Sequence, residues 1–168
     1  MHTLLIVDGA NVVGSVPDGW WRDRRGAAER LRDRLAPFAA DGLPGAGLAP
    51  PLEIVLVVEG AARRVASVPG VRTDAADGSG DDRIVELVAD RADDRRCVVV
   101  TADRELRSRV AALGAEVAGP RTVRPDAGRR AGTGRPSDTG DPSDTEPSAA
   151  EESAEGPPQT PSEGPQAP

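Results

Sequence analysis

The amino-acid sequence predicts an α/β domain built around a parallel β-sheet. Three continuous apolar runs, at residues 4–7, 54–58 and 97–100, have the composition of strands that are covered on both faces. Amphipathic segments with helical spacing alternate with these runs, which is typical of strand–helix–strand crossovers. Right-handed crossovers place helices on both faces of the sheet and bring the carboxyl ends of the strands to one edge.

The first long helix is expected over residues 24–39. Asp23 precedes it as a candidate N-cap, and Pro37 is expected to mark its frayed end. Before it, Asp8-Gly9 should end the first strand with turn chemistry, and a loop should follow. The apolar side of the helix is expected to consist of Ala27, Leu31, Leu35 and Phe38.

The remaining elements follow in alternation. Residues 41–51 are expected to form an extended loop, and a short strand is expected within residues 70–75. The segment 81–94 has the apolar spacing of a helix. The run that starts at Cys97 continues as CVVVTAD, a helix should span residues 104–113 up to Gly114, and residues 115–119 complete the sheet as a final short strand.

Composition divides the chain into a domain, residues 1–119, and a tail, residues 120–168. Val123 is the only large aliphatic residue of the tail, so this segment cannot offset the entropy of ordering and should be disordered. Its charge is uneven: residues 121–135 form a basic hinge with five arginines and one acid, whereas residues 136–168 carry eight acids and no base.

The acidic tail could be self-inhibitory, because its carboxylates could compete with a polyanionic partner for the arginines of the protein. The simpler alternative is a solvated, solubilising linker. All 21 basic residues are arginine, and Ala, Gly, Pro and Asp are abundant. This bias is typical of GC-rich bacterial genomes, so the preference for arginine is not evidence of phosphate recognition.

Cysteine usage and hydropathy indicate the cellular compartment. Cys97 is the only cysteine and lies in an apolar run, where it should behave as a small core residue. The N-terminal segment lacks the features of a signal peptide, and no run approaches the roughly 18 apolar residues of a membrane-spanning helix. We expect a soluble cytoplasmic protein without membrane contact; the sequence leaves its oligomeric state open, a homodimer included.

Acidic residues recur where the predicted strands end. Asp8, Glu59 and Asp103 each follow an apolar run, and Asp81 and Asp82 open a helix. Each of them has a simpler explanation as a turn or helix cap. Together, however, they fall on one edge of the sheet, where clustered carboxylates repel one another unless a cation neutralises them. Oxygen ligands suit hard divalent ions, so the pattern predicts a metal site.

Three segments in order resemble the NYN branch of the PIN-like nucleases: VDGANVV, GDDRIVELV and VVVTADRELRSRV. The resemblance covers about residues 3–119. Within this family, the chain resembles the bacterial members that consist of a single domain. It implies a three-layer domain whose parallel sheet has the strand order 3-2-1-4-5. It also implies an acidic pocket that holds Mg²⁺ or Mn²⁺ and a ribonuclease that hydrolyses RNA phosphodiester bonds.

The resemblance assigns roles to individual residues. Thr101 matches a hydroxyl that supports the site, and Glu59 lies at a strand end where relatives often have an acid. The aspartates are implied as metal ligands, and we hypothesise that Asp8, Asp103 and one of the pair at 81 and 82 hold the ion. Asn11 would orient substrate or a metal-bound water as a neutral donor. The implied catalytic residues are Asp8, Asn11, Asp81, Asp82 and Asp103.

The sequence lacks the residues that other hydrolytic mechanisms require. His2 is the only histidine and lies outside every motif, which argues against a histidine general base and a Ser-His-Asp hydrolase. Arg107 lies where some active relatives place a further aspartate, so a catalytically weak or inactive RNA-binding adaptor is the main alternative. A nucleotide phosphohydrolase acting in the same pocket is the third hypothesis.

Candidate RNA contacts follow the first strand and the second. Trp20 and Trp21 are the only aromatic pair, and an indole at the rim of the pocket could stack on an unpaired base. Alternatively, one tryptophan anchors its loop to the core, and the arginines form a solvated helix face. The basic candidates for phosphate contact are Arg22, Arg24, Arg25 and Arg63.

Overall fold

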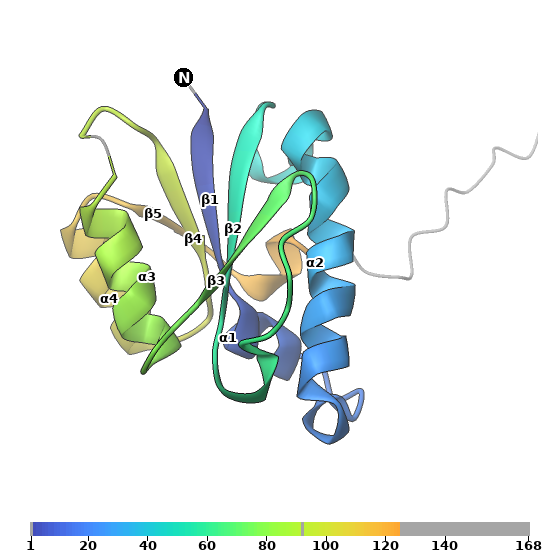
Figure 1. The fold of residues 1–168 in the computed structure, drawn as a ribbon. Helices are drawn as coiled ribbons and strands as arrows, with labels where there is room; N and C mark the ends of the chain where they lie inside the picture. Colours follow the sequence, from blue (N-terminus) through green and yellow to red (C-terminus); the bar gives the residue numbers. More distant parts are fainter. Residues whose placement is uncertain (1, 92, 125–168) are drawn as a thin grey trace, which may run out of the picture. The chain divides into compact units, whose positions relative to one another are not determined.

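The computed structural model describes residues 2–91 and 93–124, which belong to one compact unit. Five strands form one parallel sheet in the order β3-β2-β1-β4-β5 (Figure 1), as the resemblance implied. Apart from β4, which ends earlier than expected, each strand begins and ends close to its predicted position. The strands are β1 (Thr3–Asp8), β2 (Leu52–Val58), β3 (Val71–Ala75), β4 (Cys97–Val100) and β5 (Glu116–Ala118).

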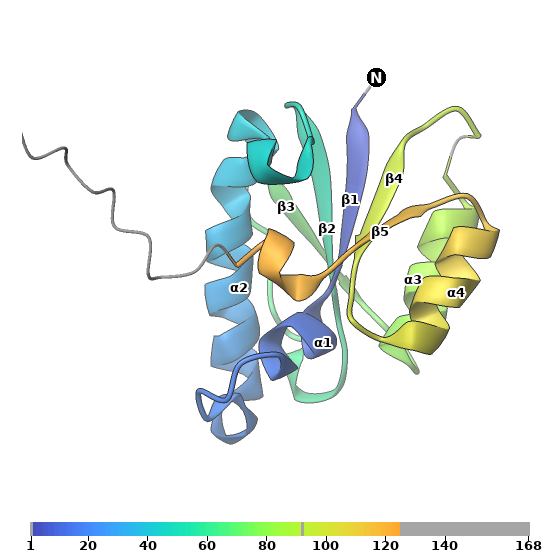
Figure 2. The same cartoon turned by 180° about the vertical axis from the view of Figure 1, so that it is seen from behind.

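Helices cover both faces of the sheet and make the domain three-layered. Figures 1 and 2 show α2 on one face and α3 with α4 on the other, while α1 lies at the end of β1 opposite the N-terminus. The α-helices are α1 (Gly9–Gly14), α2 (Arg24–Asp41), α3 (Gly80–Ala89) and α4 (Arg104–Ala112). Short 3-10 turns are η1 (Trp20–Arg22), η2 (Pro44–Ala46), η3 (Gly60–Ala62) and η4 (Pro120–Thr122).

The central strand supplies both layers of the core. Along β1, Leu5 and Val7 pack on the side of α1 and α2, whereas Leu4 and Ile6 pack on the side of α3 and α4. All four side chains are buried. A strand with both faces covered has no position for an exposed polar residue, which is why β1 is a continuous apolar run up to Asp8.

Two helices differ from their sequence-based bounds. We expected a turn and a loop after Asp8, but residues 9–14 form α1, which is too short to show a periodic apolar pattern. The helix α2 continues through Pro37 to Asp41, because a proline removes only one hydrogen-bond donor near the end of a helix. Gly42 follows as the C-cap, and its positive φ of 73° suits glycine.

The predicted helix over residues 81–94 was too long, since α3 ends at Ala89. The segment that follows is rich in charge and has no large apolar residue to continue the buried stripe. Arg91 turns back instead, and its guanidinium donates hydrogen bonds to the carbonyl oxygens of Val88 and Leu113. These bonds connect the ends of α3 and α4.

The described fold extends a few residues past position 119. Residues 120–122 form η4, and Val123 is fully buried in the core on the α2 side. Of the predicted tail, residues 125–168 lie outside the described part of the chain, and with them the acidic segment 136–168 and most of the basic hinge 121–135. Within the described residues, no helix combines the length and the apolar character needed to cross a membrane.

Gly9 allows α1 to pack closely against β2, and this contact predicts the effect of Gly9→Ala. A Cβ atom at Gly9 would lie 2.5 Å from the carbonyl oxygen of Val57 and 3.2 Å from Cδ1 of Leu56. Since backbone atoms would have to move, we expect a loss of about 1–3 kcal/mol in the free energy of unfolding, measured by chemical denaturation. The control Gly45→Ala adds a methyl group with nothing within 4 Å. Equal stability of the two variants would contradict this account.

Candidate active site

The candidate active site lies at the carboxyl end of the sheet, where β1, β2 and β4 end side by side. Asp8 ends β1, Glu59 follows β2, and Thr101 and Asp103 follow β4. The predicted strand over residues 97–103 is shorter than expected, because β4 ends at Val100. Asp8 and Thr101 are the buried polar residues of the described chain, with exposed fractions of 7% and 0%. Their burial marks this edge of the sheet as unusual, since an unpaired charge rarely lies inside a protein.

The Thr101 hydroxyl connects two acids of the site. Its Oγ1 donates a hydrogen bond of 2.9 Å to Asp8 Oδ2 and accepts one of 3.1 Å from the backbone N–H of Asp103. Asp103 Oδ1 in turn accepts a bond of 2.8 Å from the backbone N–H of Leu106, so Asp103 is the N-cap of α4. The position of α4 is therefore coupled to the carboxylate of Asp8 through one hydroxyl.

Asn11 has a structural contact that the sequence did not reveal. Its Oδ1 accepts a hydrogen bond of 2.9 Å from the backbone N–H of Ala102, which connects α1 with the turn after β4. Its own backbone N–H donates to Asp8 Oδ1 over 3.1 Å. Within the described residues its Nδ2 group has no hydrogen-bond partner, so the donor that we expected Asn11 to offer is free.

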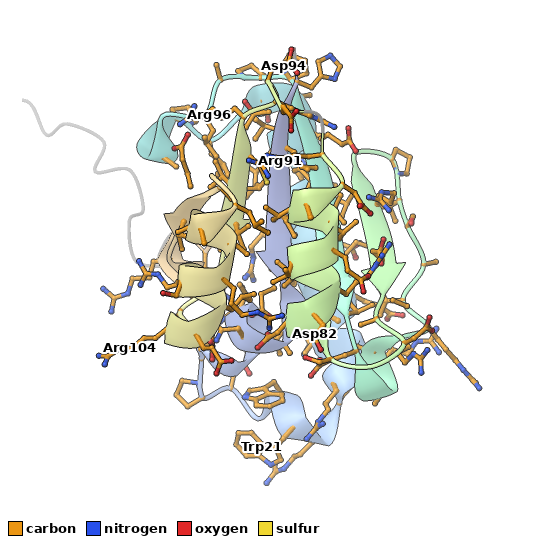
Figure 3. The ribbon with its side chains drawn as sticks, turned by 90° about the vertical axis from the view of Figure 1, so that its left-hand side faces the viewer. Trp21, Asp82, Arg91, Asp94, Arg96 and Arg104 are labelled. Carbon is orange, nitrogen blue, oxygen red and sulfur yellow. The ribbon has the colours of Figure 1, made fainter. Side chains whose placement is uncertain are left out.

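The adjacent aspartates at the start of α3 have different surroundings. Asp81 is partly buried and lies close enough to Asp103 and Glu59 for their charges to raise its pKa. Asp82 points to α4, where its Oδ1 accepts a hydrogen bond of 2.8 Å from Arg109, and its side chain is 65% exposed. Figure 3 shows Asp82 at the lower ends of α3 and α4. The structure thus brings Asp81, rather than Asp82, to the acidic cluster.

Glu59 also holds an element in place. Its Oε2 accepts a hydrogen bond of 2.6 Å from the backbone N–H of Gly80, the first residue of α3. A Cβ at Gly80 would lie 2.8 Å from that oxygen, so a larger residue would displace the Glu59 carboxylate from its present position. Glu59 therefore positions the start of α3, and with it Asp81.

We define the acidic cluster as Asp8, Glu59, Asp81 and Asp103. Burial raises the pKa of Asp8, and the charges of Asp81 and Glu59 add to this effect, while the hydrogen bonds from Asn11 and Thr101 oppose it. Burial likewise raises the pKa of Asp81, followed by repulsion from Asp103 and Glu59, which Arg109 partly offsets. Both shifts indicate that negative charge in the cluster is incompletely compensated by the protein.

The cluster has the oxygen donors that a hard divalent ion requires. In the described chain, no three His, Cys, Asp or Glu side chains are arranged to ligate a single ion together. Mg²⁺ commonly uses one or two carboxylates and keeps several waters, so an incomplete protein cage fits this ion. The donor set and the uncompensated charge therefore fit Mg²⁺ or Mn²⁺ bound partly through water.

The two tryptophans differ in their contacts. Trp20 packs against the core, and Trp21 is 55% exposed, with the two rings edge to face at 6.4 Å between centroids. The guanidinium carbon of Arg22 lies 6.0 Å from the Trp21 centroid, and that of Arg24 lies 5.5 Å from the Trp20 centroid. In Figure 3, Trp21 lies at the same end of the molecule as Asp82. Thus one tryptophan anchors the loop, and the other remains accessible.

Other predicted arginine contacts have intramolecular partners. Arg25 pairs with Glu29 at 3.0 Å, and Arg63 pairs with Asp77 at 2.8 Å. These exposed pairs are weak and do not prevent contact with phosphates. Arg107 is exposed on α4.

Arg83 follows Asp81 and Asp82 directly in the sequence but pairs with neither of them. It forms two hydrogen bonds to Asp74, of 2.7 and 3.0 Å, and a third to Glu86. Nothing in the sequence indicated that Asp74, at the end of β3, would face this arginine. The contact of Asp82 with Arg109, 27 positions away along the chain, was equally hidden.

Comparison with known proteins supports the fold. Two solved structures of Rae1 (YacP) from Bacillus subtilis are similar to this chain. One has a TM-score of 0.56 at 20% identity and covers 73% of this chain and 71% of that chain. The other, a point mutant of the same protein, gives 0.54 at 19% identity and covers 72% of each chain. At this identity the likeness shows a shared fold. No family model matches the sequence, and no curated protein gives a significant match.

The role of Thr101 predicts the effect of Thr101→Val, which keeps the shape of the side chain and removes the hydroxyl. We expect a loss of about 1–3 kcal/mol in the free energy of unfolding, because the buried Asp8 carboxylate and the Asp103 N–H each lose a partner. The pKa of Asp8 should rise further, since a bond that favours its ionised form is gone. Denaturation and side-chain carboxyl NMR measure these effects.

The matched control for this prediction is Thr73→Val. The Thr73 hydroxyl donates a single bond of 3.3 Å to the carbonyl oxygen of Ala66 at the surface. This variant should be nearly as stable as the parent protein. An equal loss of stability in the two variants would refute the special role of Thr101.

Proposed function

We propose that this chain is a divalent-metal-dependent ribonuclease that hydrolyses RNA phosphodiester bonds at the acidic cluster. The observation that carries the proposal is the buried Asp8 carboxylate, which Asp81 and Glu59 surround with further negative charge. Such an arrangement costs stability in the folded protein and is typical of a site that a cation completes. Mg²⁺ or Mn²⁺ is the proposed ion, and RNA is the proposed partner.

Within this proposal the residues have separate tasks. Asp8, Asp81 and Asp103 are the proposed ligands, of which no more than two would bind the ion directly and the rest through water molecules. Asp82 is the weaker candidate because it is engaged with Arg109. A bound ion would make a nucleophilic water more acidic and neutralise charge on the phosphate. Thr101 holds Asp8 in its orientation, and Glu59 fixes the start of α3. Asn11 offers its free amide group to a phosphate oxygen or a water molecule.

An RNA-binding adaptor without turnover is the second candidate. The observation that favours it is that no three acids of the described chain are arranged to ligate one ion. The two functions differ in their need for divalent metals. A nuclease of the proposed kind requires them for cleavage, whereas an adaptor binds RNA without them.

The charge of Asp81 leads to a prediction of pH-dependent stability for Asp81→Asn. The pKa of Asp81 is raised in the folded protein, so its ionised form is disfavoured there relative to the unfolded chain. This cost develops as the pH rises from about 3.8 through the raised pKa. In chelator, we therefore expect Asp81→Asn to melt at a higher temperature than the parent at pH 7. The gain should disappear below pH 3.8.

The neighbouring variant Asp82→Asn is the control for this experiment. It removes the exposed ion pair with Arg109 and should give no gain in melting temperature, or a small decrease. Equal behaviour of the two variants at pH 7 would show that Asp81 does not experience the charge of the cluster.

The nuclease is tested by incubating the full chain with end-labelled single-stranded and hairpin RNAs in Mg²⁺, in Mn²⁺ or in chelator. We expect metal-dependent cleavage that Asp8→Asn and Asp81→Asn each reduce by more than about 100-fold, the upper figure for loss of an outer-shell partner of a metal site. Asp82→Asn should retain more activity than Asp81→Asn. Fragment lengths distinguish cleavage within the RNA from cleavage at its ends.

The matched control for cleavage is Asp33→Asn, an exposed aspartate on α2 outside the site. It should cleave at the parent rate. RNA binding without cleavage under every condition would support the adaptor and refute the nuclease. Release of phosphate from mononucleotides, with intact RNA, would instead indicate a phosphohydrolase.

A further inference from the structure

A small pocket lies beside the acidic cluster, between α1, α2 and the end of β2. Its volume is about 150 Å³, and Glu59, a member of the cluster, forms part of its wall. We call it the α1–α2 pocket. Apart from two charged side chains, its lining is apolar or glycine, and it includes Gly9, Ala10, Trp20, Arg24, Ala28 and Glu59.

The size and lining of the α1–α2 pocket suit one flat ring. A cavity of about 150 Å³ accommodates benzene, whereas sites for drug-sized ligands measure roughly 300–1,000 Å³. The Trp20 indole is a fixed part of the wall, because it packs against the core and the Arg24 guanidinium lies 5.5 Å from its centroid. In RNA, the flat ring nearest to a phosphate is a nucleobase.

The charged side chains of the pocket complement a base and its backbone. Glu59 Oε2 accepts from Gly80, and within the described residues Oε1 has no hydrogen-bond partner. A free carboxylate oxygen accepts from an amino group, as in the pairing of Glu or Asp with cytosine N4. Arg24 forms no ion pair with an acid of the described chain, so its charge is available for a flanking phosphate.

We propose that the α1–α2 pocket is a base subsite that takes one unpaired nucleobase with an exocyclic amino group, next to the phosphate at the acidic cluster. Because Glu59 belongs to both sites, a nucleotide bound at the cluster has its neighbouring base within reach of the pocket. This inference rests on the proposed function for its substrate. The test measures the binding of free nucleosides in the presence of chelator and involves no RNA cleavage. A negative result would therefore count against the base subsite and not against the proposed nuclease activity.

The experiment follows cytidine and uridine titrations of the full chain by ¹⁵N-resolved NMR. The chain has two tryptophans, so its two indole N–H signals are easily assigned. Cytidine should shift the Trp20 indole signal and the Gly60 amide signal, and uridine should bind more weakly. Ala10→Leu fills the exposed rim of the pocket and should weaken cytidine binding at least tenfold.

Two further variants complete the test. Ala111→Leu makes the same change at an exposed position of α4 and should bind cytidine as the parent does. Glu59→Gln keeps an oxygen for Gly80 and replaces the free carboxylate oxygen by an amide group, so the preference for cytidine over uridine should be lost. The proposal is overturned if cytidine shifts neither signal, or if Ala10→Leu binds it like the parent. A chain that cleaves RNA yet fails this test remains a nuclease without the base subsite.

Discussion

The hydrogen bond from the Thr101 hydroxyl to Asp8 is the interaction on which the rest of the site depends. It places a buried donor against a buried carboxylate at the end of the central strand, where every neighbouring element begins or ends. The same hydroxyl accepts from Asp103, which caps α4. A charge in this position is unfavourable to bury, and hydrogen bonds to its ionised form reduce the cost without removing it. In the proposed nuclease, a bound cation would offset this remaining unfavourable energy.

The acids of the cluster also stabilise the fold, which explains how several like charges persist together. Asp103 caps α4, and Glu59 accepts from the first residue of α3. A helix N-terminus carries partial positive charge, so each of these carboxylates is partly compensated by backbone N–H groups. In each case one carboxylate oxygen accepts from the backbone, and within the described residues the other oxygen has no hydrogen-bond partner. The metal binding proposed above would use this second oxygen.

Much of the fold could be predicted, because burial on both faces leaves a continuous apolar run in the sequence. The strands and the carboxyl-end placement of Asp8, Glu59 and Asp103 follow from that pattern. The short helix α1 could not be predicted, since six residues show no periodicity. Nor could the difference between Asp81 and Asp82, which depends on the rotation of α3 against α4 and on the partner Arg109. Such long-range pairings leave no local signal.

The position of Asp81 is set by contacts at both ends of its helix. At the start of α3, Glu59 accepts from Gly80, and beyond its end the Arg91 guanidinium donates to carbonyl oxygens of Val88 and Leu113. Figure 3 shows Arg91 at the opposite end of the helix from Asp82. Repulsion among the acids alone would push α3 away from β1, and these contacts, with the Ile84 and Val88 side chains in the core, resist that movement. The position of Asp81 is therefore fixed by one member of the cluster, Glu59, together with contacts outside the cluster at Arg91, Ile84 and Val88. These contacts keep the acids close together against their mutual repulsion.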